Sequence, residues 1–347
     1  MFEELINKSG KWINSKGPDS DVVISSRVRL ARNIGGFVFP QLLRDQDYEK
    51  IFAQVKKAAA KSKALKNAHI VSINQLDDID RYLLVERHLI SYDHAAADRK
   101  RAVIFSKDES ISVMVNEEDH LRMQVILPGI QLQECWRKLD TLDTELEREL
   151  AFAFSPEAGY LTACPTNTGT GLRASMMVHL PALVISKDIN KILQRMNQLG
   201  LVVRGFYGEG IEIRTAFFQI SNQISLSQTE SEIIVNIERI TRQIMENEHK
   251  ARASLFKTNK AKIEDNIWRA YGLLKSARTI SFEEAITLLS SLRLGAETGI
   301  IKVKLKTINE LLISAQPGHI QRISGKPMPE EARDIKRAEL IRNKLRD

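Results

Sequence analysis

One stretch of the sequence, Cys164 to Pro181, passes from a loop-like to a strand-like pattern, and this limits what the chain can fold into. Its first half is rich in turn residues, whereas the run after Arg173 alternates as a β-strand does. Arg173 therefore lies where a loop ends and a predicted strand begins, and a charged side chain in a sheet needs a partner. A hairpin corner with a salt-bridged arginine is one interpretation. Contact with a phosphate or nucleotide is the other, and the loop residues suited to it are Thr166, Thr168, Gly169, Thr170 and Gly171.

A second predicted strand carries two arginines on one face. In VVISSRVRLARN, Val22 to Asn33, side chains alternate between the two faces, so Arg27 and Arg29 project from the same one. Two such charges repel each other unless an anion lies between them. An exposed basic strand at a sheet edge is the alternative.

The run SISVMVNEEDHLRMQVIL, Ser110 to Leu127, predicts two strands around an acidic turn. If it is extended, Glu118, His120 and Arg122 share a face, with carboxylate and guanidinium roughly 13 Å apart at about 3.3 Å per residue. That spacing suits the two ends of a phosphoryl transfer, and a polar hairpin tip is the alternative.

Further elements follow from periodicity and capping signals. A strand from Leu201 ends in a glycine-rich loop that carries Arg204 and Glu209, and a simple chain reversal would need neither charge. Capping boxes at 227–230 and 281–284 predict helix starts, and Gly295 and Gly299 predict helix breaks. Helices are predicted over 2–7, 45–65, 131–148, 186–199, from 227–230 to about Ala253, and over 330–345 after Pro329.

Charge is distributed unevenly along the 347 residues. Residues 255–347 carry 18 Lys and Arg against 11 Asp and Glu, whereas residues 1–254 carry 33 of each. Strand patterns also stop after Leu255. We therefore predict two domains, 1–254 and 255–347, of which the smaller, basic one meets something anionic.

Several classes of protein are disfavoured. No apolar run approaches the roughly 18 residues of a membrane helix, and the first residues lack the core of a signal peptide, so we expect a cytoplasmic protein. Cys135 and Cys164 form neither a disulfide framework nor a metal-ligand spacing. The motifs of P-loop enzymes and of ordinary protein kinases are absent from the sequence.

The charged residues at strand ends indicate nucleotide chemistry. Guanidiniums bind phosphoryl oxygens two at a time, so a set of arginines can hold ATP. Carboxylates can act as bases and can pair with a cationic acceptor. The residues concerned are Arg27, Arg29, Arg122, Arg173 and Arg204, with Glu118 and Glu209.

Four segments, SSRVRLARN, NEEDHLR, CPTNTGTGLRAS and RGFYGEG, occur in this order. They resemble the signature segments of the ATP:guanido phosphotransferases, and in detail those of the bacterial protein-arginine kinases. The resemblance implies an α+β fold: a bent antiparallel sheet flanked by helices, plus a small all-α C-terminal domain. It also implies ATP with Mg2+ as the phosphoryl donor.

The resemblance implies a role for each matching residue. Glu118 would be the base that accepts the proton of the attacking guanidinium, Glu209 would align that group, and Cys164 would lie beside its nitrogens. Glu117 would help to order the waters of the magnesium ion. The nucleotide contacts would come from Ser25, Ser26, Arg27, Arg29, His88, Arg122, Arg173, Ser175, Arg204, Gly205 and Gly208.

The segment RDIKRA, Arg333 to Ala338, matches a phosphoarginine-binding segment of the protein-arginine kinases. On a helix Arg333 and Arg337 lie on one face, which by itself fits a salt-bridged solvent face. The resemblance implies that both arginines take the phosphoryl group of a phosphoarginine and Asp334 its guanidinium. Together with Ala338 they would form an allosteric site.

The resemblance further implies arginine side chains of proteins as the substrate. Few residues precede SSRVR, so we expect no helical domain closing over the site, and Tyr207 stands where small-molecule kinases carry another arginine. A homodimer, an activator protein, a stress-gene repressor as substrate and delivery to a Clp-type unfoldase are also implied. The alternatives are a kinase of free arginine or another small guanidino compound, and a DNA-binding regulator.

Overall fold

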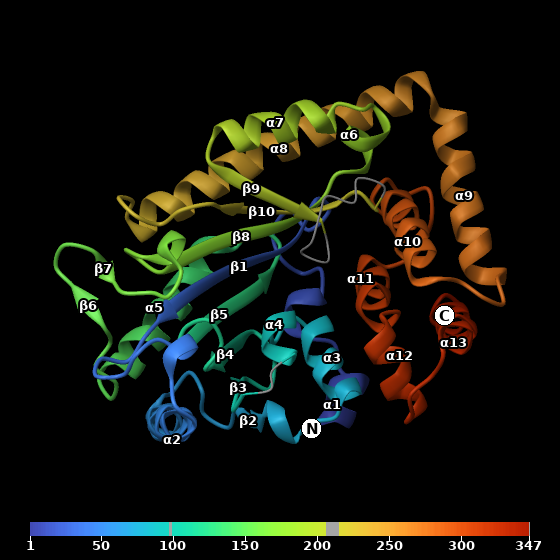
Figure 1. Ribbon diagram of the computed structural model, residues 1–347. Helices are drawn as coiled ribbons and strands as arrows, with labels where there is room; N and C mark the ends of the chain where they lie inside the picture. The colour runs from blue at the N-terminus through green and yellow to red at the C-terminus, as the bar shows by residue number, and fades with distance from the viewer. Residues whose placement is uncertain (97–98, 206–214, 347) are drawn as a thin grey trace.

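The computed structural model describes residues 1–96, 99–205 and 215–346, which form an antiparallel sheet flanked by helices (Figure 1). Within these residues the sheet has eight strands in the order β2-β3-β4-β5-β1-β8-β10-β9, and every neighbouring pair is antiparallel. The strands are β1 (Val23–Arg32), β2 (His69–Ser72), β3 (Ala102–Phe105), β4 (Ile111–Val115), β5 (Leu121–Pro128), β8 (Leu172–His179), β9 (Leu201–Gly205) and β10 (Phe217–Asn222), besides the small hairpin of β6 (Phe154–Ser155) and β7 (Gly159–Tyr160).

The helices occupy both ends and the back of the sheet. They are α1 (Phe2–Asn7), α2 (Asp45–Lys61), α3 (Asp78–Glu86), α4 (Tyr92–Ala95), α5 (Leu132–Glu147), α6 (Pro181–Ile185), α7 (Ile189–Gln198), α8 (Glu230–Thr258), α9 (Lys260–Ser276), α10 (Phe282–Glu297), α11 (Leu305–Ser314), α12 (Pro317–Ser324) and α13 (Glu330–Lys344), with short 3-10 turns η1 (Lys11–Ile13), η2 (Pro40–Leu42), η3 (Ile73–Gln75) and η4 (Pro165–Asn167). The predicted fold class is confirmed.

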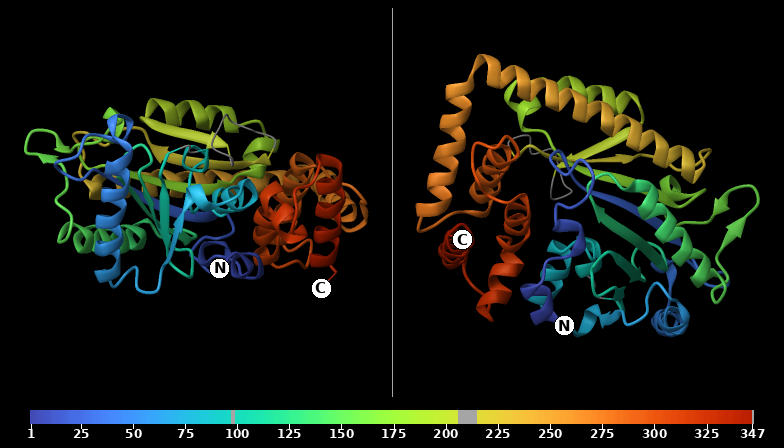
Figure 2. Two further views of the ribbon diagram at one scale, coloured as in Figure 1. Left: turned by 60° about the horizontal axis from the view of Figure 1, so that its bottom comes forward. Right: turned by 180° about the vertical axis from the view of Figure 1, so that it is seen from behind.

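The back face of the sheet carries the largest apolar core. Alternate residues of the central strand, such as Val28 and Leu30, are fully buried there against α2, α5, α7 and α8. Figure 2 shows α5 and α8 lying across this face from behind. Side chains alternate between the two faces of a strand, and the arginines of β1 alternate with these buried residues. The arginines therefore lie on the front face of the sheet.

The front face is covered only at its ends. Near one edge, α1 and α3 pack on β3 and β4. The C-terminal helices α9 to α13 form a second core that also takes in Trp12 and Ile13 of η1 and apolar residues of the four neighbouring strands β5, β1, β8 and β10. Between these two coverings the middle of the front face is left for polar side chains.

Helix α8 differs from its prediction at both ends. Its capping box lies at Thr229 and Glu232, two residues later than expected, because Ser227 adopts a left-handed backbone (φ 64°) and cannot begin the helix. The helix continues to Thr258, so the predicted domain boundary at 254/255 falls inside its last turn.

The C-terminal helices follow the prediction except at Gly295. This glycine lies inside α10, where a Cβ would come within 2.4 Å of the Ile267 side chain, so it serves close helix packing rather than a break. Gly299, with φ 77°, follows the end of the helix as expected. Pro329 caps α13. Among the described residues no helix is both long and apolar enough to cross a membrane.

Candidate active site

Strand β1 at the centre of the sheet organises the polar front face. Arg29 pairs in register with Arg173 of β8, and Ala31, two residues on, pairs with Arg122 of β5. Residues that pair across antiparallel strands share a face, so these arginines point to the same side as Arg27. Arg204 of β9 joins them from the edge through its register with Gln219 of β10.

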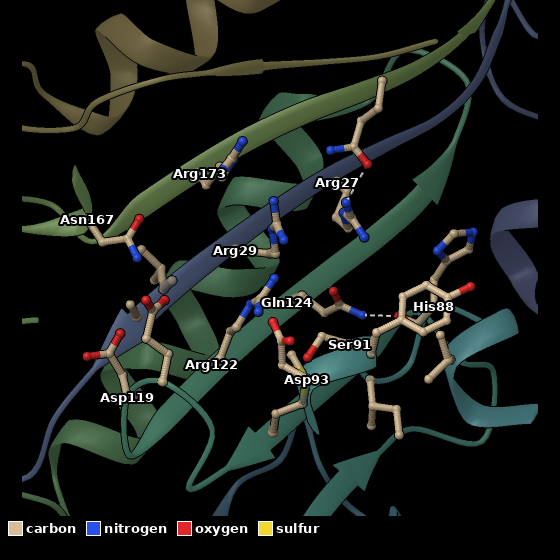
Figure 3. Close-up of a pocket in the computed structure, with 18 of the residues that line it drawn as sticks. Arg27, Arg29, His88, Ser91, Asp93, Asp119, Arg122, Gln124, Asn167 and Arg173 are labelled. Carbon is tan, nitrogen blue, oxygen red and sulfur yellow. Dashed lines mark hydrogen bonds between the residues drawn. The ribbon is translucent and has the colours of Figure 1, made fainter. Parts of the chain in front are cut away.

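The five arginines line one cavity of about 350 Å³, together with His88 and Glu118. In Figure 3 the guanidiniums of Arg29, Arg122 and Arg173 converge from three neighbouring strands toward a common space. The predicted convergence therefore includes all five arginines, although the sequence places them up to 177 positions apart, from Arg27 to Arg204.

Burial and mutual repulsion act on these arginines. Both effects lower the pKa of Arg27 to about 9 and that of Arg173 to about 10, and they hold the pKa of Arg29 well below its ordinary value. The Nε atoms of Arg29 and Arg173 are buried without a hydrogen-bond partner among the described residues. A site of this kind is electrostatically incomplete by itself, and an anion with several oxygens would complete it.

Arg122 differs because it has a counterion of its own. Its Nη1 donates to both oxygens of Glu117 at 2.7 and 2.8 Å, and the Ser91 hydroxyl donates to the same carboxylate. Burial alone would raise the pKa of Glu117, but Arg122 and Ser91 hold it at about 2. Glu117 thus orients a guanidinium, which the sequence did not indicate.

Two glutamines are further residues of the site that sequence reasoning missed. Gln219 accepts a hydrogen bond from Arg27 at 2.7 Å, and Gln124 donates to the carbonyl of His88. Both are uncharged, so only the strand register could have indicated them. Other cavity-lining residues missed are Ser91, Asp93, Asn167 and Gln316.

His88 borders the cavity as a neutral side chain. Burial and the nearby Arg27 lower its pKa to about 3. Its ring meets that of Trp12 edge-on, with 5.0 Å between centroids, and its backbone is left-handed (φ 58°). These contacts fix where the imidazole lies.

Glu118 stands exposed at the rim of the cavity, on the turn between β4 and β5. Partial withdrawal of its carboxylate from water, then the charges of Asp119 and Glu117, raise its pKa. The chain is not extended here, because Asn116 N–H bonds back to the His120 carbonyl and closes the turn. The predicted shared face is therefore wrong for His120, which is buried and accepts from the Ile34 N–H at 3.0 Å.

The loop before β8 lies beside the arginines and its Gly171 lines the cavity, but the close contacts of the glycines are with the protein itself. Gly171 has φ 68°, and a Cβ there would lie 2.6 Å from the Ala31 carbonyl, so the close approach is to β1. Arg32 holds the same loop: it pairs with Asp143 at 2.7 Å and donates to the Thr170 carbonyl at 2.9 Å. Cys164 is partly buried with Sγ 3.0 Å from Thr166 Oγ1 and does not line the cavity.

The remaining predicted nucleotide contacts divide by strand face. Ser25 and Ser175 line a small cavity of about 20 Å³ next to Arg27 and His88. Ser26 points to the opposite face, where its hydroxyl donates to the Gly129 carbonyl at 2.7 Å. Gly205 ends β9 directly after Arg204. The predicted Gly208 and Glu209 lie outside the described residues.

The RDIKRA segment forms part of α13, away from the cavity. Arg337 is buried and donates to the backbone carbonyls of Ala315 (2.7 Å) and Ile280 (2.9 Å), and it pairs with Asp334. Arg333 is half-buried with an unbonded Nε among the described residues, and Ala338 is fully buried. The two arginines thus do not share an open face.

Comparison with known proteins identifies the family to which the chain belongs. Residues 50–251 match the family described as ATP:guanido phosphotransferase, C-terminal catalytic domain, and residues 260–347 match the protein-arginine kinase McsB C-terminal domain. A protein-arginine kinase of Desulforamulus reducens is 47% identical over 349 residues, which cover 99% of this chain and 98% of that one. The chain belongs to the protein-arginine kinases of the ATP:guanido phosphotransferase family.

Other relatives agree with this membership. A protein-arginine kinase of Syntrophomonas wolfei is 48% identical over 339 residues, covering 96% of this chain and 94% of that one. Among solved structures, a lombricine kinase has a TM-score of 0.60 at 22% identity, over 71% of this chain and 72% of that one. The duplicated taurocyamine kinase of Schistosoma mansoni has a TM-score of 0.57 at 24% identity, over 71% of this chain and 34% of that one. These two structures show that the chain shares their fold.

Proposed function

We propose that this protein transfers the γ-phosphoryl group of ATP to arginine side chains of proteins. The observation that carries the proposal is the convergence of five arginines and Glu118 on one cavity. ATP use follows from the family, and arginine side chains as acceptors follow from the names of the relatives.

The cavity is suited to a polyphosphate. Four of its arginines have no carboxylate partner among the described residues, and two of these have unbonded buried Nε atoms. Phosphate oxygens would supply the missing acceptors and neutralise the repulsion that lowers the pKa values of Arg27 and Arg173. Magnesium, when bound with ATP, would neutralise further phosphate charge. Glu117 is a poor candidate for its waters, because both of its oxygens are bonded to Arg122.

In the proposed step a guanidinium nitrogen of the substrate attacks the γ-phosphorus. The N–P bond forms as the bond to the bridging oxygen breaks, ADP leaves, and the nitrogen's proton passes to Glu118. The arginines would stabilise the charge of the transferring group. A raised pKa suits Glu118 to this task, since a stronger base accepts a guanidinium proton more readily. Glu209 would align the acceptor, and Cys164 would lie beside its nitrogens.

The wider predictions remain part of the proposal. They comprise Ser25, Ser175, Gly205 and Gly208 as nucleotide contacts, whereas Ser26 is left out because its hydroxyl is bonded on the opposite face of the sheet. The proposed domains are a catalytic domain of residues 1–254 and a phosphoarginine-binding domain of residues 255–347 that tunes activity through Arg333, Asp334, Arg337 and Ala338. The wider predictions also comprise a cytoplasmic homodimer, an activator protein, a stress-gene repressor as substrate, and marking of proteins for Clp-type degradation.

The proposal is tested by incubating the protein with magnesium ATP and either casein or free arginine, followed by mass spectrometry without acid. We expect phosphate on casein arginine side chains. Phosphorylation of free arginine alone would favour a small-molecule kinase, and no acid-labile phosphate on either would overturn the proposal.

The Glu118→Gln variant tests the base. It keeps the size of the side chain but cannot accept the proton, so kcat should fall by about 10²- to 10⁴-fold. Glu157→Gln is the matched control, because Glu157 lies exposed near the β6–β7 hairpin and bonds only to Ser155 in the described structure. Near-normal turnover in Glu118→Gln would exclude this role.

A further inference from the structure

The C-terminal helices touch the catalytic half of the chain at a carboxylate next to the cavity. Helix α12 packs on α3, and the Glu86 carboxylate at the end of α3 meets the first turn of α12. It accepts hydrogen bonds from the Gly318 N–H at 2.6 Å, the His319 N–H at 2.8 Å and His319 Nδ1 at 2.7 Å. Glu86 is 6% exposed and His319 2% exposed, so these bonds are largely shielded from bulk water.

The two residues after Glu86 are fixed just as closely. Arg87 pairs with Glu109 and donates to the Lys8 carbonyl at 2.8 Å. Its Nη1 also lies 3.4 Å from Nε2 of His319, which accepts there if Nδ1 carries the proton bonded to Glu86. The next residue is His88, whose left-handed backbone and contact with Trp12 turn its ring toward the cavity. The segment 86–88 thus connects the contact with α12 to the cavity wall.

Helix α12 also reaches the cavity directly. Gln316, the residue directly before the helix, lines the cavity beside Glu86 and His88. The residue before it, Ala315, accepts a hydrogen bond from buried Arg337 of α13. One continuous set of contacts thus joins α13, the start of α12, Glu86 and His88.

We propose that Glu86 is a positioning residue, through which the C-terminal helices set the affinity of the cavity for the nucleotide. The inference rests on the proposed function, because it takes the cavity beside His88 as the ATP site. Glu86 holds the segment 86–88 in place, whereas Glu118 and Arg122 stand on a different turn and strand. Loss of the Glu86 contact should therefore raise the KM for ATP and leave kcat at saturating ATP nearly unchanged.

A single methyl group offers a test from the C-terminal side. In Gly318→Ala the new Cβ would lie 2.9 Å from Glu86 Oε1, so the carboxylate must move, while the helical backbone of α12 accepts alanine readily. We expect the KM for ATP to rise by about 5-fold or more. Gly272→Ala is the matched control, since Gly272 lies inside α9 with no heavy atom within 4 Å of its Cβ position.

The carboxylate itself offers a second test. Glu86→Gln keeps the shape but can accept fewer of the three hydrogen bonds, so its KM for ATP should also rise. The control is Asp80→Asn, which removes another α3 carboxylate that faces α12, 3.3 Å from Arg322 and outside the cavity lining. The double variant Glu86→Gln/Gly318→Ala should be little worse than the more affected single variant, because both changes break the same contact.

Different results separate the two proposals. If Glu86→Gln and Gly318→Ala match their controls in KM and kcat while the unmodified protein phosphorylates casein arginines, the positioning role is wrong and the kinase stands. If Asp80→Asn raises the KM for ATP as much as Glu86→Gln does, or if kcat falls together with the rise in KM in Glu86→Gln, general loosening of the α3–α12 contact explains the data and the inference fails. An unmodified protein that transfers no phosphate contradicts the proposed function instead.

Discussion

At the residue scale, Arg122 is the arginine of the site that has a carboxylate partner among the described residues, and the other four have none. Glu117 is 6% exposed and bonded to Arg122 through both oxygens. Its replacement would leave Arg122 as one more uncompensated charge beside Arg29 and Arg173, to which Arg122 is electrostatically coupled. The same pair also fixes the direction of the guanidinium.

We therefore expect Glu117→Gln to lower the free energy of unfolding by about 3 kcal/mol, as for a broken buried ion pair, and to lower kcat. Glu134→Gln is the control, since Glu134 pairs with Arg137 on the solvent side of α5 and should change stability by less than about 1 kcal/mol. Urea unfolding of both variants measures the difference. Equal losses would show that Glu117 is not the structural counterion of Arg122.

The raised pKa of Glu118 gives a prediction for pH. A base works only when ionised, so the rate should fall as the pH drops through this raised pKa, above the 4.5 of an ordinary glutamate. Asp119→Asn removes the neighbouring charge that raises this pKa and should move the acid limb of kcat/KM toward lower pH. Because Asn keeps an oxygen that can accept from Asn33 and Ala163, the turn should survive. An acid limb that moves upward would contradict the assignment.

At the element scale, the alternation of β1 predicted the front face correctly, since Arg27 and Arg29 are two residues apart in an extended chain. The same rule could have separated Ser25 from Ser26, which lie on opposite faces. What periodicity could not predict is the register, and hence the pairing of Arg29 with Arg173 or the position of Gln219. Register depends on core packing and turns distant in the sequence. The chain around Glu118 also differs from the extended conformation that was predicted, because the hydrogen bond from the Asn116 N–H to the His120 carbonyl forms a turn there.

The contact of Gly171 with β1 can be isolated by a pair of alanine variants. Gly171→Ala and Gly36→Ala both place a side chain on a left-handed backbone, with φ 68° and 82°, which costs about 1–2 kcal/mol. Only at Gly171 does the added Cβ meet the Ala31 carbonyl and Arg32, whereas the space at Gly36 is open. We expect Gly171→Ala to lose about 2 kcal/mol more in urea unfolding and to reduce kcat/KM by displacing Arg173. Equal losses would show that the loop does not depend on this close approach.

At the scale of the whole molecule, a buried ionic cluster joins α8 and α10 to the end of β8. Arg252 donates to Glu248 at 2.7 Å and forms an ion pair with Glu297 at 2.9 Å, and Arg293 pairs with Glu297. Asp21 lies 3.9 Å from Arg252, so two guanidiniums face three carboxylates. His179, which ends β8, accepts from Arg293 at 3.0 Å and is neutral, since burial holds its pKa well below the usual range. The sequence gave no sign of this cluster, because its members are scattered from position 21 to position 297.

The burial of Glu297 in this cluster predicts how stability depends on pH. Burial raises the pKa of Glu297 to about 6, so the folded state favours its protonated form. Its contribution to stability is complete below the ordinary value of 4.5 and is lost as the pH rises through about 6, by about 2 kcal/mol in total. Glu297→Gln mimics the protonated form and should remove this part of the pH dependence. Urea unfolding of both proteins on either side of this range measures it, and parallel profiles would show that Glu297 does not titrate there.

Composition and charge predicted a helical, basic C-terminal part, but they did not show how it meets the catalytic half. Gln316 is uncharged, and Glu86 belongs to no motif that the sequence analysis identified. The two residues are more than 200 positions apart. Contacts of such separation follow from the packing of α12 on α3, which no local pattern encodes. For this reason the residues predicted best are those in short charged motifs, and those predicted least are the ones that join the two parts.

The carbonyl partners of Arg337 set a condition on any phosphorylated ligand that enters between α10 and α13. If a phosphoryl group drew Nε and Nη1 of this guanidinium away from Ala315 and Ile280, the two carbonyl oxygens would lose this donor in a buried setting. Under the proposed phosphoarginine-binding role of α13, ligand binding would therefore be coupled to the order of the segment that leads into α12. The phosphoryl group of the ligand and two main-chain oxygens would compete for one guanidinium.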